Sequence, residues 1–243
     1  MFKDFLLVKA SPQVARDKVQ SYLQFNHAPL ALSTQAVGSS MQRYTMSHLV
    51  DEPSDLICLY PTPPDLVTVV EHKLLGGAEK VHMIMADEEY IEKVVPDEKH
   101  MIENLMAGMP QFVAVESEQT IFGQRQQSSK RLFEFLRRLP GVSREDFLAR
   151  LQEEGDWASA DRQYNSAVEL RVHSFVGSGP LPVGATEDAP VATEEPFDAV
   201  VESWVTQPDI LASLSDTITT RRTRYCDTDR SLAALTNENV IRL

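Results

Sequence analysis

Histidine is the residue type that most directly suggests chemistry in this chain. Its unperturbed pKa lies near neutrality, so an imidazole can both take up and release protons under physiological conditions. The histidines are unevenly spread, since five of the six precede residue 101 and only one follows it. We interpret this as chemistry concentrated in the first half of the chain, the alternative being histidines scattered over a surface. They are His27, His48, His72, His82, His100 and His173.

Two of these histidines fall in segments that read as strands. His72 alternates with Val70 and Leu74, so it shares their face of an expected strand over 66–74. Tyr44 and His48, four residues apart, share a face of an expected strand over 41–50. A tyrosine hydroxyl can hold a carbonyl or enolate oxygen while a histidine moves a proton. We therefore predict catalytic roles for His72, Tyr44 and His48. The structural alternatives are a half-buried imidazole bonded to the backbone and an aromatic side chain at a barrel rim.

His27 stands in "FNHAPLAL" (25–32), where an expected helix runs into Pro29. Because proline interrupts helices, we expect the helix to end at His27 and the imidazole to face a cavity, which makes His27 a fourth catalytic candidate. A plain stop signal is the alternative. Methionines fill irregular apolar gaps, so "VHMIM" (81–85) suits either a pocket or an ordinary core. The predicted substrate-binding residues are His82, Met46, Leu30 and Met85.

Other chemistry has weaker support. Glu71 and Glu202 occupy matching "VVE" segments. Because a carboxylate among valines needs a partner, we expect these two to bond across the molecule. A catalytic acid is the alternative. The sequence has no GxGxxG motif, no P-loop and no GxSxG motif. We predict no metal and no cofactor. A haem would require an axial ligand, for which His82 or His173 are the candidates.

Length, composition and net charge limit the classes of protein to which the chain can belong. The chain has 243 residues, 42% of them hydrophobic and 24% charged, with a formal net charge of −13. Such a charge repels a phosphate backbone, so we expect no nucleic-acid partner. No apolar run approaches the roughly 20 residues of a membrane span, and the first residues do not resemble a signal peptide. The two cysteines form no framework or zinc motif, and a cytoplasmic location is the default.

The chain repeats itself. "FLLVKASPQVARDKVQSYLQ" (5–24) aligns with "FEFLRRLPGVSREDFLARLQ" (133–152), and "DLVTVVEHKL" (65–74) aligns with "FDAVVESWVT" (197–206). The two matches occur in the same order at nearly the same spacing, which indicates a duplicated unit. In this alignment His72 matches Ser203, and His27 matches Gly155. We divide the chain into a first unit (1–122), a linker (123–130) and a second, scaffold-like unit (131–243).

Each unit predicts the order β-α-β-β-α-β. The expected strands of the first unit are 5–9, 41–50, 66–74 and 112–121, with helices near 14–24 and 78–90. The second unit predicts strands 132–136, 168–176, 199–205 and 233–242, with helices near 143–152 and 209–219. Ser143 with Asp146 is typical of a helix N-terminus. Two such units can bury their bare sheet faces against each other. We therefore predict an α+β protein in which two ferredoxin-like units form an intramolecular dimeric α/β-barrel.

"SPQVARDKVQSYLQFNHAPLA" and "DLVTVVEHKLLGGAEKVHMIMADEEYI" resemble the EthD-like family of the dimeric α/β-barrel superfamily. The second unit keeps "GVSREDFLARL" and "PFDAVVESWVTQPDILASL" but departs at the histidine and at Ala86-Asp87-Glu88. The resemblance implies cofactor-independent chemistry on aromatic, polyketide or terpenoid substrates, with histidine and tyrosine moving protons. Haem-binding relatives exist as well.

These expectations combine into one functional hypothesis. The chain is predicted to be a cofactor-independent acid–base enzyme, a lyase, dehydratase, cyclase or isomerase acting on a hydrophobic aromatic or polyketide-like carbonyl compound. The alternatives are a non-catalytic carrier of a hydrophobic intermediate and an oxygen-using monooxygenase. The expected partner is a small hydrophobic substrate, and the chain is a monomer or a homodimer, with exposed sheet edges as a route to pairing.

Overall fold

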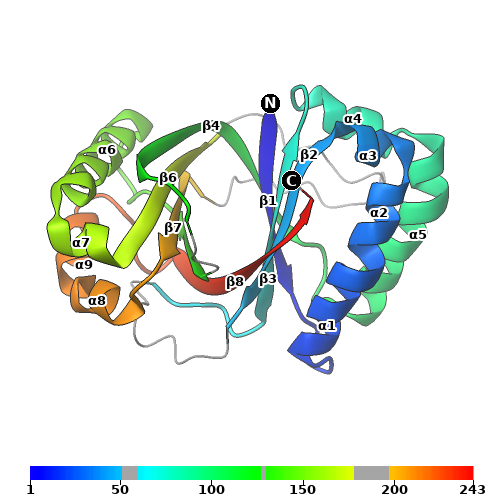
Figure 1. Cartoon of the computed structure of the whole chain (residues 1–243), viewed down its shortest axis with the longest axis horizontal. Helices are drawn as coiled ribbons and strands as arrows, with labels where there is room; N and C mark the ends of the chain where they lie inside the picture. Colours follow the sequence, from blue (N-terminus) through cyan, green and yellow to red (C-terminus); the bar gives the residue numbers. More distant parts are fainter. Residues whose placement is uncertain (51–59, 127–129, 178–196, 243) are drawn as a thin grey trace.

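A closed antiparallel barrel stands at the centre of the molecule (Figure 1). It comprises eight strands within residues 1–50, 60–126, 130–177 and 197–242, the parts of the chain that the computed structural model describes. The strands of the first half are β1 (Phe2–Lys9), β2 (Met41–Leu49), β3 (Leu66–Leu74) and β4 (Gln111–Gly123). Those of the second half are β5 (Lys130–Leu136), β6 (Val168–Val176), β7 (Ala199–Val205) and β8 (Leu232–Arg242).

The two halves have the same strand order. Around the barrel the strands follow β1-β3-β2-β8-β5-β7-β6-β4, so each half contributes four neighbouring strands with its first and third strands side by side. The halves meet at two antiparallel pairs, β2 with β8 and β4 with β6. Because every one of these strands has two neighbours, the expectation of exposed sheet edges is wrong: a closed barrel has no edge to offer another chain.

Helices cover the barrel on two opposite sides (Figure 1). The first half supplies α1 (Arg16–Tyr22), the π-helical turn η1 (Leu23–His27), α2 (Ala28–Ser33), α3 (Gln35–Ser40), α4 (Glu79–Met85) and α5 (Glu88–Asn104). The second half supplies α6 (Arg144–Ala160), α7 (Arg162–Ala167), α8 (Pro208–Ser213) and α9 (Ser215–Arg222). As expected, Ser143 caps α6, since its hydroxyl accepts a hydrogen bond from the Asp146 amide.

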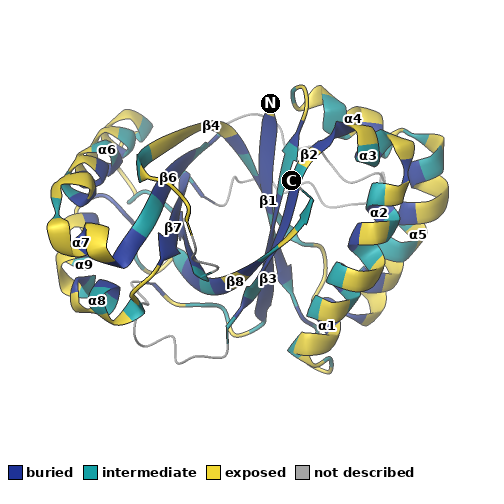
Figure 2. Ribbon diagram, viewed as in Figure 1, coloured by how far each residue is buried: buried dark blue, intermediate teal, exposed yellow. Residues whose placement is uncertain are grey.

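Three apolar cores follow from strand alternation. Successive residues of β3 point to opposite sides, so Val70 packs under the helices of the first half while Val69 packs inside the barrel. A matching core lies between β5–β8 and the helices of the second half. Figure 2 shows the result, with buried strands in the middle and helices exposed only on their outer faces. The ends of two strands cross between the halves, since Phe122 of β4 packs against the core of the second half and Ile241 of β8 against that of the first.

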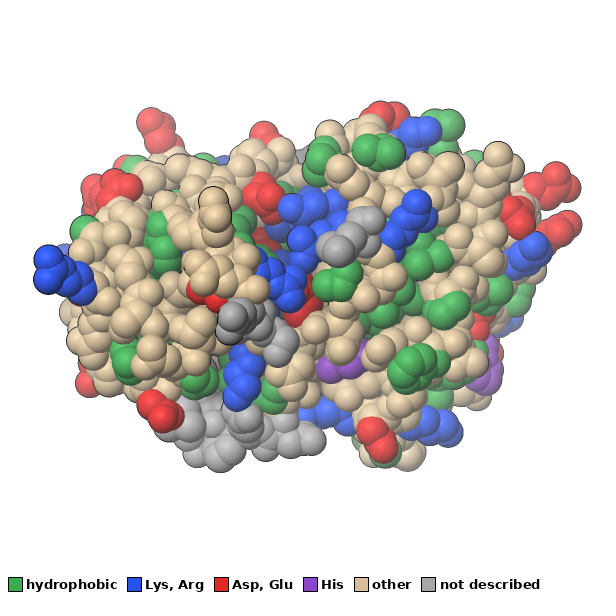
Figure 3. Space-filling view, viewed as in Figure 1, with side chains coloured by type: hydrophobic (Ala, Val, Ile, Leu, Met, Phe, Trp, Pro, Cys, Tyr) green, Lys and Arg blue, Asp and Glu red, His purple; other side chains and the backbone are tan. Residues whose placement is uncertain are grey.

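The barrel interior also holds a buried ion network that joins the halves. Arg131 of β5 bonds Glu71 of β3 at 2.7 Å and also bonds Glu202 of β7, while Lys3 of β1 bonds Glu202 at 2.7 Å. Glu238 of β8 accepts a further bond from Arg131 at 3.1 Å. The expected bond across the molecule at Glu71 and Glu202 is thus present. In Figure 3 basic side chains gather in the middle of the visible face, between the helical layers, with acidic ones beside them.

Some element predictions need correction. The helix expected over 78–90 is two helices, because Asp87 accepts a hydrogen bond from the Tyr90 amide and so begins a new one. That helix, α5, continues through Pro96 to Asn104, beyond the predicted end at residue 90. The Pro-rich segments 51–65 and 177–196 predict a loop in each unit, and they fall mainly in 51–59 and 178–196, outside the described residues. No helix in the described part of the chain is long and apolar enough to cross a membrane.

Candidate active site

A carboxylate, an imidazole and a phenol meet on three neighbouring strands of the first half. Strand register places His72 of β3 beside Asp4 of β1 on one side and Tyr44 of β2 on the other. His72 Nδ1 lies 2.9 Å from Asp4 Oδ1, and the His72 and Tyr44 rings pack edge to face with centroids 4.6 Å apart. With Nδ1 held by the carboxylate, Nε2 is the ring nitrogen left to exchange protons. The three side chains form what we call the Asp4–His72–Tyr44 cluster.

His72 and Tyr44 share faces with the residues that strand alternation predicted, and this side of the sheet lies under the helices of the first half. Tyr44 is 2% exposed, whereas the His72 side chain is 18% exposed. Burial raises the pKa of Tyr44 well above its usual value, and the charges of Asp4 and Glu98 add to the effect. Tyr44 therefore keeps its proton at neutral pH and can act as a hydrogen-bond donor toward an oxygen.

Helix α5, which covers the sheet on the same side, carries the acidic residues Asp97 and Glu98. Its inner face repeats at helical spacing, with Tyr90, Val94 and Met101 buried. Asp97 bonds the His27 Nδ1 atom at 2.8 Å and accepts a bond from the Tyr22 hydroxyl at 2.5 Å. These bonds, led by the one from His27, lower the pKa of Asp97. The neighbouring Glu98 accepts a hydrogen bond from the Tyr90 hydroxyl, and burial raises its pKa.

His27 does not end a helix, contrary to expectation. The helical backbone runs on from α1 through η1 into α2, with Pro29 in the first turn of α2. The Ala28 amide bonds back five residues to the Leu23 carbonyl, which is the wider π-helical turn. This turn places Pro29 where a missing amide proton is tolerated, so the chain continues. His27 reaches α5 from within the helix, through Asp97.

His48 occupies the predicted face of β2 but makes two hydrogen bonds of its own. Its Nδ1 lies 2.9 Å from Thr68 Oγ1, and its Nε2 lies 3.1 Å from Gln24 Oε1. Burial lowers the pKa of His48 to about 4. An imidazole with both nitrogens engaged is suited to joining α1–η1 to the sheet, and it lies apart from the Asp4–His72–Tyr44 cluster, separated along β2 from Tyr44 by Met46.

The predicted substrate-binding residues lie at different depths in the first half. Met46 is fully buried in the core of the first half, and Leu30 packs partly buried against that core. Met85 is partly exposed on α4, while His82 on the same helix is exposed to solvent. The adjacent methionine-rich segment therefore serves core packing on one side and surface on the other. Their role in substrate binding stays a prediction.

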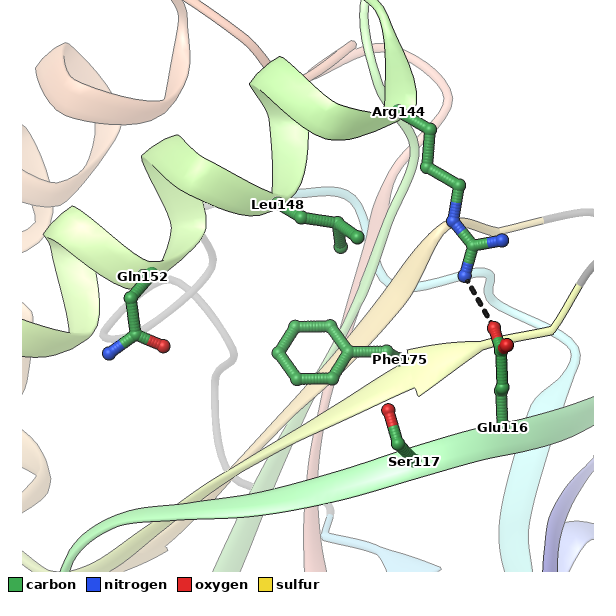
Figure 4. A pocket seen from close by; sticks show the side chains of 6 residues that line it. All are labelled: Glu116, Ser117, Arg144, Leu148, Gln152 and Phe175. Atoms are coloured by element: carbon green, nitrogen blue, oxygen red, sulfur yellow. Dashed lines mark hydrogen bonds and ion pairs between the residues drawn. The ribbon is translucent and has the colours of Figure 1, made fainter.

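Two hollows lie at or beside the second half. One, of about 490 Å³, opens beside α6 (Figure 4). In it Arg144 pairs with Glu116 at 2.9 Å and also bonds the Val176 carbonyl at 2.7 Å, so its charge is already neutralised. Leu148 and Phe175 give it an apolar floor. Neither this hollow nor the second one, beside Pro140, includes a predicted site residue.

The second half replaces the cluster with different residues. Strand register pairs Leu132 of β5 with Ser203 of β7, and Ser203 with Arg171 of β6, at the positions of Asp4, His72 and Tyr44. Arg171 bonds Glu154 of α6 at 2.5 Å.

Arg222 of α9 bonds Glu154 at 2.7 Å and also bonds Glu134 of β5. These two arginines and two glutamates, all fully buried or nearly so, neutralise one another. The second half thus holds a closed ion network where the first half holds the Asp4–His72–Tyr44 cluster.

Comparison with known proteins shows the fold. No protein-family model and no curated protein matches the sequence. An "anthrone oxidase-like protein" superposes with a TM-score of 0.61 at 9% identity, over 99% of this chain and 92% of that one. A "putative monooxygenase" from Fusobacterium nucleatum gives 0.52 at 8% identity, over 98% and 93%. A chlorite dismutase from Candidatus Nitrospira defluvii gives 0.50 at 8% identity, over 97% and 90%.

These structures belong to the dimeric α/β-barrel superfamily, and at such low identity the likeness concerns the fold alone. The structure also shows the surroundings of the two histidines named above as candidate axial ligands of a haem. His173 is fully buried, its Nε2 accepts a bond from Arg171 at 2.9 Å, and its ring packs against Gly155. Burial holds the pKa of His173 well below its usual value. His82 is exposed on α4. Neither arrangement fits an axial ligand.

In the described ranges, no group of three or more His, Cys, Asp or Glu side chains is arranged to hold a metal ion. Asp4 and Glu98 are the site residues that the sequence analysis missed. The sequence pattern could have identified Asp4, since it alternates with Phe2 and Leu6 on one face of a strand that carries no other acid. It could not have identified Glu98, because the helix was predicted to end at residue 90.

Proposed function

We propose that the first half carries a cofactor-independent acid–base active site built on the Asp4–His72–Tyr44 cluster. The observation that carries this proposal is the hydrogen bond between His72 Nδ1 and the Asp4 carboxylate, with the Tyr44 phenol beside the ring. A carboxylate that orients an imidazole fixes its tautomer and favours its protonated form, which is how histidine bases are commonly supported. The matching positions of the second half, Leu132, Ser203 and Arg171, offer no such base.

The chemistry that suits this cluster is removal of a proton next to a carbonyl group. His72 Nε2 takes the proton from carbon, and Asp4 stabilises the imidazolium that results. The Tyr44 hydroxyl donates a hydrogen bond to the carbonyl oxygen as negative charge develops there. Return of the proton to another atom completes an isomerisation, an elimination or a cyclisation. The surrounding core of the first half is apolar, which supports a hydrophobic aromatic or polyketide-like substrate.

The same proposal covers the origin of the fold. The shared strand order of the halves and the repeats in the sequence support two ferredoxin-like units in tandem, of the EthD-like kind. Within the Asp4–His72–Tyr44 cluster, Asp4 and Tyr44 are buried and the His72 side chain is partly exposed. The partly exposed edge of His72 is the side from which we expect entry. We retain the cytoplasm as the expected location.

The test is deuterium exchange at an acidic carbon. Anthrone, named in a structural neighbour, has such a carbon next to its aromatic ketone system, and NMR in D₂O follows the exchange directly. We expect the protein to accelerate exchange and His72→Ala to lower that rate about 10²–10⁴-fold, the usual contribution of a general base. Asp4→Asn should lower it as well. His100→Ala, on an exposed histidine of α5, is the matched control.

The rival functions give different outcomes. If the protein binds the probe with unchanged affinity between pH 6 and 8 and accelerates no exchange, it is a carrier and the enzymatic proposal is wrong. If oxygen is consumed as the probe reacts, proton abstraction starts an oxygenation and the protein acts as a monooxygenase. If the His72→Ala protein stays fully active, the catalytic base is another residue and the role proposed for His72 is wrong.

A further inference from the structure

The hollow of about 490 Å³ beside α6 combines an apolar floor with polar groups at its two ends (Figure 4). Leu148 of α6 and the ring of Phe175 of β6 form the floor, and both are only partly buried. The Gln152 side chain lies at one end, and the Arg144–Glu116 pair lies at the other. An apolar lining with a few polar groups at its edge is typical of a small-molecule site.

In the first half the matching place is closed by hydrogen bonds. His48 of β2 stands between the helical layer and the neighbouring strand, with its Nε2 atom 3.1 Å from Gln24 Oε1 and its Nδ1 atom 2.9 Å from Thr68 Oγ1. This bridge ties the helical layer to the sheet. Space that a ligand could use is therefore taken up by side chains of the protein.

The second half lacks this bridge. Strand register pairs Phe175 of β6 with Ala199 of β7, just as it pairs the histidine and the threonine of the first half. Neither side chain can make a hydrogen bond. Gln152, which the internal repeat aligns with the glutamine of the first half, bonds Asp156 of its own helix at 3.0 Å. Three matched substitutions or redirected contacts thus leave an apolar space between α6 and the sheet.

A β-bulge shapes the polar end of the hollow. Glu116 is an extra residue of β4, because its neighbours Val115 and Ser117 pair with adjacent residues of β6. Such a bulge re-aims side chains, and here the Glu116 carboxylate points toward Arg144 (Figure 4). The matching strand pair of the first half, β2 with β8, runs through residues 48 and 49 without an extra residue.

Arg144 is the charged group best placed to hold a ligand. Its Nη2 atom donates one hydrogen bond to the Val176 carbonyl at 2.7 Å and another to Glu116 at 2.9 Å. The backbone bond holds the guanidinium at the edge of the hollow, whereas the Glu116 side chain is 61% exposed and can turn into water. Exposed ion pairs contribute little to stability, so another carboxylate can replace Glu116 on Arg144 at small cost.

We propose that this hollow is a binding site for a small aromatic carboxylate. The ligand carboxylate pairs with Arg144 in place of Glu116, and the ring lies against Leu148 and stacks on Phe175. Burial of the ring favours the exchange, because the charge of the arginine stays paired throughout. The site is separate from the Asp4–His72–Tyr44 cluster and shares no residue with it, so this inference does not depend on the proposed function.

The test measures the binding of 2-naphthoate to the full chain by isothermal titration calorimetry. We expect Arg144→Met to weaken binding about tenfold or more, the usual effect of losing a charged hydrogen-bond partner. Glu116→Gln should tighten binding, because it removes the competing carboxylate. 2-Naphthamide, which has the same ring but no charge, should bind more weakly than 2-naphthoate. Arg150→Met, at an exposed position of α6, is the matched control and should bind like the wild type.

A double variant tests the open space itself. Phe175→His combined with Ala199→Thr supplies the two side chains of the first-half bridge opposite Gln152. We expect this variant to tie α6 to the sheet and to lose the binding of 2-naphthoate. If it fails to fold, NMR of the wild type decides the matter, since bound naphthoate should give nuclear Overhauser effects to the Leu148 methyl groups; their absence overturns the proposal.

Other results would overturn the proposal as well. They are a wild type that does not bind 2-naphthoate, an Arg144→Met variant that binds it as tightly as the wild type, and a Glu116→Gln variant that binds it more weakly. The anthrone exchange reaction plays no part in these measurements. The aromatic carboxylate site can therefore fail while the acid–base function stands, and the reverse is equally distinguishable.

Discussion

His48 shows how a single buried histidine makes the fold sensitive to acid. Its folded pKa is about 4, below the value of about 6.5 expected in an unfolded chain. Between pH 6.5 and pH 4 the unfolded state binds more protons than the folded state. The neutral, buried His48 therefore costs no stability above pH 6.5, and the free energy of unfolding declines as the pH falls from 6.5 toward 4. We expect the melting temperature to fall over this window, with His173 adding to the loss.

The measurement is a thermal melt at each pH together with an NMR titration of the imidazole signals. His48→Gln keeps hydrogen-bonding groups near Thr68 and Gln24, and its melting temperature should depend less on pH between 6.5 and 4. A His48 signal that titrates near 6.5 would contradict the hydrogen-bonded, neutral state described here.

At the scale of single residues, some site residues could be predicted from the sequence and others could not, and each case has a physical reason. Tyr44 and His72 were predicted on the helix-covered face because strand alternation fixes sidedness. Their partner Asp4 lies 68 positions from His72 in the chain, and only the strand register brings them together. Helix α4 leaves His82 exposed and Met85 partly exposed, a placement that the apolar pattern of 81–85 did not indicate.

Helix α6 packs against the sheet at Gly155, and this close contact limits the size of the side chain at that position. A Cβ atom added to Gly155 would lie 3.1 Å from His173 Cε1 and 3.2 Å from an Ile121 methyl carbon. We expect Gly155→Ala to destabilise the protein by about 1–3 kcal/mol, the usual cost of overpacking. Urea denaturation measures this, with the exposed Glu153→Ala on the same helix as control. An unchanged stability would mean that α6 shifts outward at little cost.

Element boundaries were predictable where periodicity was strong. The strands expected over 66–74 and 168–176 coincide with β3 and β6 because valine and other β-branched residues are frequent in them. The continuation of the helix through Pro29 was not predictable, since a π-helical turn depends on packing against α5 rather than on local propensity. The same holds for α5, whose Pro96 reads as a breaker but lies within a helix secured by buried Tyr90, Val94 and Met101.

On the scale of the whole molecule, Arg131 ties the halves together. It is 1% exposed and bonds Glu71 of the first half and Glu202 and Glu238 of the second. Removing it leaves buried carboxylates without their main counter-charge, so we expect Arg131→Met to lower the free energy of unfolding by about 3–5 kcal/mol. Arg144→Met, which breaks the more exposed pair with Glu116, should cost about 0–1 kcal/mol.

Chemical denaturation at pH 7 measures both variants, and equal losses would argue against the network. The pH dependence has a definite sign. Arg131 and Lys3 hold the pKa of Glu71 well below its usual value, so this stabilisation is present above the unfolded pKa and is lost as the pH falls below it. The barrel itself followed from the internal repeats. The basic partner of Glu71 and Glu202 did not, because Arg131 lies 60 positions from Glu71 and 71 from Glu202.

The closed barrel also bears on how the two halves can differ. In a barrel made of two identical chains, every substitution appears twice, once in each subunit. The Asp4–His72–Tyr44 cluster and the Arg171–Glu154–Arg222 network occupy matching places, and one sequence could not supply both. Carrying the halves in a single chain removes that symmetry. One half can then specialise in proton transfer, while its counterpart gives up that chemistry for rigidity.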